Sequence, residues 1–262
     1  MNASWATIVD KIYVITTSKS DRLKDFIQSM PFDHNLIKVH NMQIKEEFQV
    51  QHYPNTGNYK NEKTTNAFKT VFKDAIDYGY NKVLIFEDDA RFDSRVSKDT
   101  VQKILNWIQT NDWDFFFLGH LAIGPQFMTN EYIVRTHGSL LNHAVCYSRK
   151  MLLLLYNHLQ VTNQIKWNYF HPRNHNKPYY SNDDFIRVEC PHVKAYACRP
   201  TLFYQCIETP DIVKARKAGI FPGSKIEDWQ NSVNDSVIGV TGLIILIPLI
   251  ILIVLIVALI PN

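Results

Sequence analysis

The chain has 262 residues and a formal net charge of +3. This length suits one large α/β domain with an appended segment, and such a domain buries a sufficient core without disulfides. The weakly basic balance gives no reason to expect a nucleic-acid partner. The four Cys form no CxxC pair, which disfavours a zinc ribbon or a thioredoxin-like site.

Short apolar runs alternate with helical patterns along the first two thirds of the chain. Rich β-branched and aromatic content predicts strands over residues 11–16, 82–86 and 114–118, the last ended by Gly119. Helical spacing and breakers predict helices over residues 20–30, 64–78 and 148–158, and a further helix around 101–108. The alternation indicates an α/β domain with a largely parallel sheet, in which ligands bind at the carboxyl ends of the strands.

An acidic turn follows the apolar run at residues 82–86, which leads directly into Glu87, Asp88 and Asp89. Adjacent carboxylates repel one another unless a cation or a basic side chain neutralises them. In an extended segment, residues i and i+2 point the same way, so Glu87 and Asp89 are predicted to approach one ion together. Their oxygen atoms suit Mg²⁺ or Mn²⁺. The alternative is a solvated acidic turn without a ligand.

A second acidic pair, Asp183 and Asp184, occurs later in the motif SNDDF. One of these carboxylates is a candidate general base. The alternative for such a pair is a turn or a helix cap.

An uncharged run rich in Ile, Leu and Val occupies residues 237–260. A helix over this run is about 36 Å long, against a hydrocarbon core of about 30 Å, so the run predicts one transmembrane helix. We expect a catalytic domain at 1–213, a juxtamembrane linker at 214–236 and the span at 237–260. No secretory pattern opens the sequence, which favours a tail anchor with a cytosolic domain. Basic residues ahead of the span agree with this orientation: Lys214, Arg216, Lys217 and Lys225.

Four blocks of the sequence resemble, in order, glycosyltransferase family 25, which includes lipo-oligosaccharide and collagen hydroxylysine galactosyltransferases. They are KIYVITTSKSDRLKDF (residues 11–26), VLIFEDDARF (83–92), LNHAVCYSRKMLLLL (141–155), and SNDDF (181–185) with YACRPTLFYQ (196–205). Two departures stand out. Thr16 and Thr17 replace the usual Asn-Leu, and Phe68 and Lys69 replace a Ser-His pair that precedes the acidic motif.

The resemblance implies a GT-A fold, a Rossmann-like nucleotide-sugar domain. It implies inverting transfer of a hexose, usually galactose, from a UDP-sugar donor to a hydroxyl of a glycan, lipopolysaccharide or protein acceptor. The implied cofactor is Mn²⁺ or Mg²⁺, held by Glu87 and Asp89. Either Asp183 or Asp184 is then the base.

The resemblance also implies that the donor contacts Arg22, Asp88 and His143. For Arg22 the alternative is a solvated helix residue, and for His143 it is a buried hydrogen bond. Two other functions remain open: a catalytically degenerate, membrane-anchored sugar-binding or scaffolding protein, and a metal-dependent phosphoesterase or nuclease. The latter is disfavoured because the dispersed ligands of a two-metal site are missing.

Overall fold

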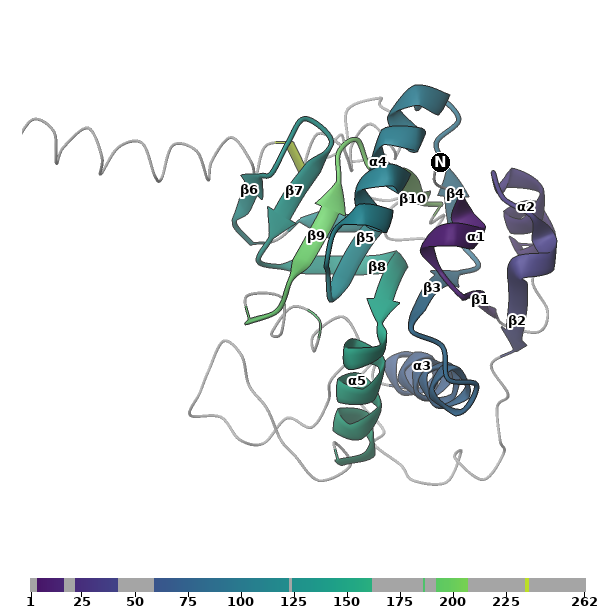
Figure 1. The fold of residues 1–262 in the computed structure, drawn as a ribbon. Helices are drawn as coiled ribbons and strands as arrows, with labels where there is room; N and C mark the ends of the chain where they lie inside the picture. Colours follow the sequence, from purple (N-terminus) through teal and green to yellow (C-terminus); the bar gives the residue numbers. More distant parts are fainter. Residues whose placement is uncertain are drawn as a thin grey trace, which may run out of the picture.

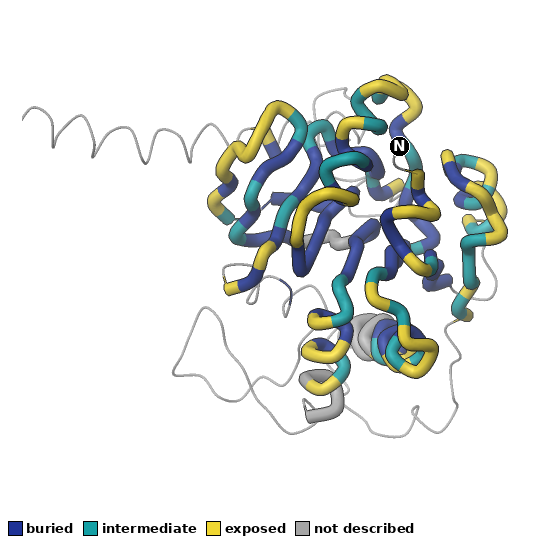
Figure 2. The backbone as a smooth tube through the Cα atoms, viewed as in Figure 1, coloured by how far each residue is buried: buried dark blue, intermediate teal, exposed yellow. Residues whose placement is uncertain are grey.

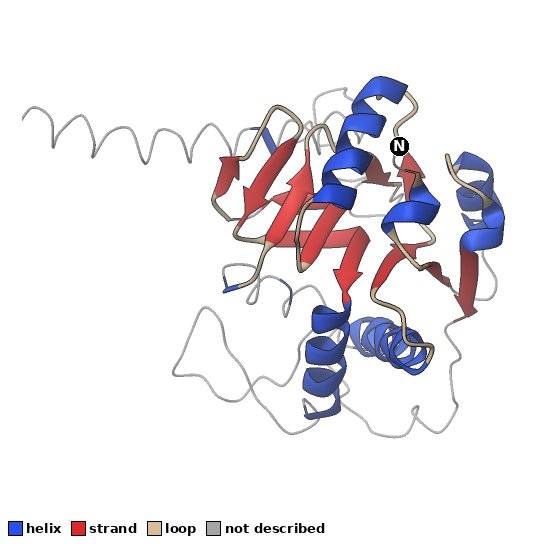
Figure 3. Ribbon diagram, viewed as in Figure 1, coloured by secondary structure: helices blue, strands red, loops and turns tan. Residues whose placement is uncertain are grey.

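The computed structural model of the protein describes residues 4–16, 22–41, 59–122, 124–161, 186, 192–206 and 234–235. Helices lie on both sides of a central sheet (Figures 1 and 3). The helices are α1 (Trp5–Ile8), α2 (Arg22–Ser29), α3 (Tyr59–Asp77), α4 (Lys98–Thr110) and α5 (Arg149–Val161), with a 3-10 turn at His34–Leu36. The strands are β1 (Lys11–Thr16), β2 (Ile37–Asn41), β3 (Lys82–Glu87), β4 (Ala90–Phe92), β5 (Phe115–Ala122), β6 (Gln126–Met128), β7 (Ile133–Thr136), β8 (Ser139–Ser148), β9 (Ala195–Cys198) and β10 (Phe203–Gln205).

The main sheet has eight strands in the order β2-β1-β3-β8-β5-β9-β7-β6, and β10 pairs with β4 in a small second sheet. Strand β1 is parallel to β2 and β3, and β5 is parallel to β9, whereas β8 is antiparallel to both β3 and β5. At the far edge β7 is antiparallel to β9 and β6 to β7. Within the main sheet, the described strands other than β8 and β7 therefore run in one direction, which gives this sheet a shared carboxyl edge.

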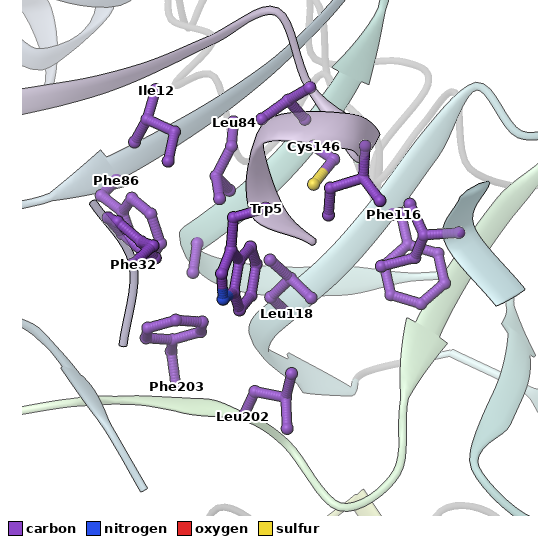
Figure 4. Packing of buried hydrophobic residues seen from close by; sticks show 14 of the residues in the cluster. Trp5, Ile12, Phe32, Leu84, Phe86, Phe116, Leu118, Cys146, Leu202 and Phe203 are labelled. Carbon is purple, nitrogen blue, oxygen red and sulfur yellow. The ribbon is translucent and has the colours of Figure 1, made fainter. Parts of the chain in front are cut away.

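Two hydrophobic layers sandwich this sheet. In one layer, α1, α2 and α4 pack against strand residues such as Ile12, Leu84 and Phe116. In the other layer, α3 and α5 pack against the alternate strand residues, such as Tyr13 and Ile85. Successive side chains of a strand point to opposite faces, so each buried strand supplies both layers. Figure 2 shows the strands buried and the outer faces of the helices exposed, and Figure 4 shows the first layer from close by.

Several predicted elements are confirmed. The strand at 11–16 is β1, the run at 82–86 is β3 with Glu87 added, and the run at 114–118 opens β5. The helix predicted at 64–78 is α3, although it begins at Tyr59. The apolar positions that predict this helix are buried at Ala67, Phe68, Val71, Phe72 and Ala75, and Ile76 is half-buried. Gly79 follows α3 with φ 74°, the left-handed conformation in which glycine ends helices.

One prediction about strands is wrong. Gly119 does not end its strand, since β5 continues to Ala122 with irregular register on either side of the glycine. The block at 196–205 contains parts of β9 and β10, with the cis peptide bond Arg199–Pro200 between them. Proline has no N–H to donate to a ladder, so it separates the strands.

The predicted membrane span at 237–260 lies outside the described residues. No helix within the described part of the chain is long and apolar enough to cross a bilayer.

Candidate functional site

The acidic turn lies at the carboxyl edge of the sheet, between β3 and β4. Glu87 is the last residue of β3, and Asp88 and Asp89 form the turn that leads into β4. The Asp88 N–H donates to the Ile15 carbonyl at 3.1 Å, which fixes the turn against the end of β1. The parallel pairing of β1 and β3 thus determines where the carboxylates lie.

Asp88 is held from two sides. The Thr16 hydroxyl donates to Asp88 Oδ2 at 2.6 Å, and the Arg22 guanidinium lies 3.6 Å from Oδ1. The Asp88 side chain is only 8% exposed, whereas that of Arg22 is 49% exposed. Arg22 therefore covers the turn and keeps an open face toward solvent, where a second anion can bind.

Asp89 is the carboxylate with an incomplete set of partners. It is buried, and Gln205 Nε2 donates to its Oδ2 at 3.2 Å. Its Oδ1 is buried and has no hydrogen-bond partner among the described residues. Burial raises the pKa of Asp89, and nearby Asp88 adds to the rise, while His143, Gln205 and Arg22 oppose it. A buried carboxylate oxygen without a donor is costly unless a cation or a proton meets it.

The guanidinium of Arg91 also stabilises the acidic turn. Arg91 Nη1 donates to the carbonyls of Asp88 and Ala90, and Nη2 donates to the carbonyl of Arg22 at 3.3 Å. The last contact places the first turn of α2 beside the acidic turn. Helix N-termini carry partial positive charge and free N–H groups, so this end of α2 favours an anion near the carboxylates.

His143 supports the site indirectly. Its ring is fully buried, and Nε2 donates to the Phe203 carbonyl at 2.9 Å. Phe203 opens β10, the strand that carries Gln205 to Asp89. The ring lies directly against Gly119, where an added Cβ would stand 2.4 Å from Nε2. Only glycine leaves room for this contact, which explains the glycine inside β5.

Aromatic side chains fix β10 from its other side. Phe203 packs edge-on against Trp5, Phe86 and Phe92, with ring centroids 6.1, 4.8 and 5.5 Å away (Figure 4 shows the first two). Trp5 belongs to the short helix α1, which no sequence pattern predicts. The N-terminal helix thus helps to position Gln205 and, through it, Asp89.

The structure brings together several of the residues predicted from the sequence. Arg22, Asp88 and Asp89 form one cluster, and His143 reaches it through β10. The extended backbone ends at Glu87, and Asp88 and Asp89 form a turn. The expectation that Glu87 and Asp89 point the same way, toward one ion, therefore stays a prediction. Asp183 and Asp184 lie outside the described residues. Within the described ranges no group of three or more His, Cys, Asp or Glu side chains forms a ready-made metal site.

Two contacts of the acidic turn have no signal in the sequence. Gln205 reaches Asp89 across 116 positions, and Arg91 bridges α2 and the turn across 69. Both depend on which strands become neighbours, which hydrophobic patterns do not specify. The sequence predicts Gly119 only as the end of a strand, because its contact with a ring from another strand leaves no local pattern.

Among known proteins, only solved structures show a similarity to this chain, and that similarity is low. No protein-family model matches the chain, and no curated protein does. Among solved structures, a glycosyltransferase involved in the glycosylation of the major capsid of PBCV-1 is similar at 11% identity and a TM-score of 0.40, over 80% of this chain and 99% of that chain. UDP-glucose pyrophosphorylase in its apo form is similar at 9% identity and a TM-score of 0.41, over 80% and 81%. A197 from STIV is similar at 12% identity and a TM-score of 0.35, over 71% of this chain and 80% of that chain. These TM-scores are too low to support an inference.

Proposed function

We propose that this protein is a metal-dependent glycosyltransferase that moves a hexose from a UDP-sugar to a hydroxyl acceptor, with inversion. The observation that carries the proposal is the buried Oδ1 of Asp89, which has no hydrogen-bond partner in the described part of the chain and lies at the carboxyl edge of the sheet, near the exposed guanidinium of Arg22. A cation and a diphosphate together would satisfy both groups. The resemblance to family 25 supports galactose as the sugar and a glycan, lipopolysaccharide or protein as the acceptor.

Glu87 and Asp89 fit Mn²⁺ or Mg²⁺ as a partial set of ligands that substrate phosphates would complete. Such ions are commonly held by one or two carboxylates together with substrate phosphates, and they need no complete protein cage. Asp89 and Glu87 are the proposed ligands, and Asp88, already occupied by Thr16 and Arg22, is the support for the turn. The bound ion would stabilise the negative charge that develops on the departing UDP.

The chain's own groups account for the remaining steps. Arg22 and the N-terminus of α2 present positive charge to the donor phosphates. One carboxylate of the pair Asp183 and Asp184 takes the proton of the acceptor hydroxyl on the face of the sugar opposite UDP. We further propose that residues 237–260 anchor the protein as a single-pass, tail-anchored membrane protein with its catalytic domain in the cytosol.

The metal site is tested by thermal unfolding of the full chain with Mn²⁺ and UDP, compared with chelator. Ligands that bind the folded state raise its stability by about 2.7 kcal/mol at a concentration one hundred times Kd. Asp89→Asn should abolish the Mn²⁺-dependent rise in Tm, and should also abolish Mn²⁺-stimulated hydrolysis of UDP-sugar. In chelator the variant should be no less stable than the parent, because it removes a buried charge.

Asp93→Asn is the matched control. Asp93 is a buried carboxylate in the same segment, but both of its oxygens accept hydrogen bonds from Arg95, at 2.8 and 2.7 Å. This variant should lose stability yet keep the full Mn²⁺-dependent rise. An equal Mn²⁺ response in the parent and in Asp89→Asn would contradict the proposed ligand.

A degenerate, sugar-binding protein is the second candidate, and one observation favours it. Phe68, which stands at the family's Ser-His pair, is buried in the hydrophobic layer under α3 and offers no polar group. If the parent binds UDP-sugar with Mn²⁺ but neither hydrolyses nor transfers it, this candidate is correct.

A further inference from the structure

The residues that precede the predicted span are docked onto the sheet. Asn234 is 6% exposed, and its side-chain amide is fully used. Its Oδ1 accepts from the Ala122 N–H at 2.7 Å, and its Nδ2 donates to the Thr201 hydroxyl at 3.1 Å and to the His120 carbonyl at 3.4 Å. Because Ala122 ends β5, Asn234 is fixed at the carboxyl edge of the sheet.

Arg199 connects the next residue to the β6–β7 hairpin. Its Nε donates to Asp235 Oδ1 at 2.7 Å, while its Nη1 lies 3.8 Å from Met128 Sδ. The Arg199 N–H also donates to the Tyr132 carbonyl in the hairpin turn, at 2.7 Å. Met128 and Asp235 therefore contact the same guanidinium.

The end of this hairpin exposes two large apolar side chains, Phe127 at 37% and Met128 at 43%. Single exposed apolar residues are common, so their exposure alone means little. Their place is informative, because the uncharged run begins at Val237. Only Ser236 separates the docked Asp235 from Val237 in the sequence, and two residues of chain span at most about 7 Å.

We propose that the β6–β7 hairpin rests on the surface of the lipid bilayer, with Phe127 and Met128 in contact with lipid. This inference depends on the proposed membrane anchor at 237–260. Apolar and aromatic side chains beside a span prefer the interfacial region of the bilayer. The buried amide of Asn234 fixes the chain to the sheet shortly before residue 237, so in this proposal the domain is held against the bilayer.

Contact of the β6–β7 hairpin with the bilayer would also orient the candidate site. The hairpin turn and the acidic turn lie at the same carboxyl edge, five strand positions apart, which is about 24 Å at the usual strand spacing. An acceptor carried in the same membrane would then lie near the edge where we propose that the donor binds.

Fluorescence quenching in vesicles tests this arrangement. The full chain, with Cys190 and Cys206 replaced by Ser, is given an environment-sensitive dye at Met128→Cys and reconstituted into phosphatidylcholine vesicles containing spin-labelled lipid. The matched control is Leu153→Cys, which is 40% exposed on α5. That helix follows β8, whose last residue pairs with Lys82 at the opposite edge of the sheet. Figure 1 shows α5 well apart from β6 and β7.

The dye at position 128 should lose most of its fluorescence and the dye at 153 should keep it. Adding Asn234→Ala should restore fluorescence at 128 while the chain stays with the vesicles, since only the contact of the hairpin with the bilayer is lost. Equal brightness at both positions in vesicle-bound protein overturns this contact but leaves the membrane anchor standing. A chain that does not stay with vesicles overturns both.

Discussion

Replacing Gly119 with alanine tests whether the contact of Gly119 with His143 and β10 supports the candidate site. The new Cβ would stand 2.4 Å from His143 Nε2, 2.7 Å from His143 Cδ2 and 2.7 Å from the Phe203 carbonyl oxygen. Real Cβ atoms do not approach so closely, and one of the three neighbours is backbone. The ring of His143 must therefore move, and β10 must move with it.

Two costs follow. Overpacking a well-filled core costs about 1–3 kcal/mol, and losing a buried hydrogen bond such as that from His143 to Phe203 costs about 1–3 kcal/mol. Each kcal/mol lowers Tm by about 2–4 °C in a domain of this size, so Gly119→Ala should lower Tm by at least about 4 °C. Because β10 carries Gln205, the variant should also weaken the Mn²⁺-dependent rise in Tm.

Circular dichroism of the full chain measures both effects, and His143→Ala provides the coupling control. Once the ring is absent, two of the three close contacts disappear, so Gly119→Ala should cost clearly less in the His143→Ala background than in the parent. If the single variant melts within about 2 °C of the parent, roughly half of the smallest shift expected, the ring does not lie against Gly119. Equal costs in both backgrounds would refute the same contact.

Two further predictions concern buried side chains. Burial, helped by nearby His143, lowers the pKa of His120 to about 3 from 6.5, so below about pH 6.5 the unfolded chain takes up a proton that the folded chain does not. The contribution of His120 to stability is therefore complete above pH 6.5, and below it the free energy of unfolding falls by up to about 1.4 kcal/mol per pH unit toward pH 3. His120→Gln should flatten this slope in urea unfolding, and an unchanged slope would contradict the prediction. Trp5→Ala should cost about 3–5 kcal/mol of unfolding free energy and lower the affinity for UDP with Mn²⁺, because the ring supports Phe203. Unchanged affinity in a destabilised Trp5 variant would mean that α1 supports the fold alone.

The sequence determined the parts that depend on local pattern. Apolar runs and helical spacing located β1, β3, α3, α4 and α5, because a buried strand or an amphipathic helix leaves a periodic record in its own residues. The same patterns located the acidic turn, since carboxylates directly after an apolar strand lie at a sheet edge. The left-handed Gly79 is likewise a local requirement.

Only the tertiary structure decided which distant segments complete the site. The partners of Asp88 and Asp89 are Thr16, Arg22 and Gln205, which come from three other elements. Strand order places them there, and strand order depends on packing between residues far apart in the chain. The same holds for Asn234. Its amide is buried because β5 and Thr201 supply the donor and the acceptors that it needs. A hydrogen bond between remote residues leaves no periodic signal, so these contacts emerge only when the chain is folded.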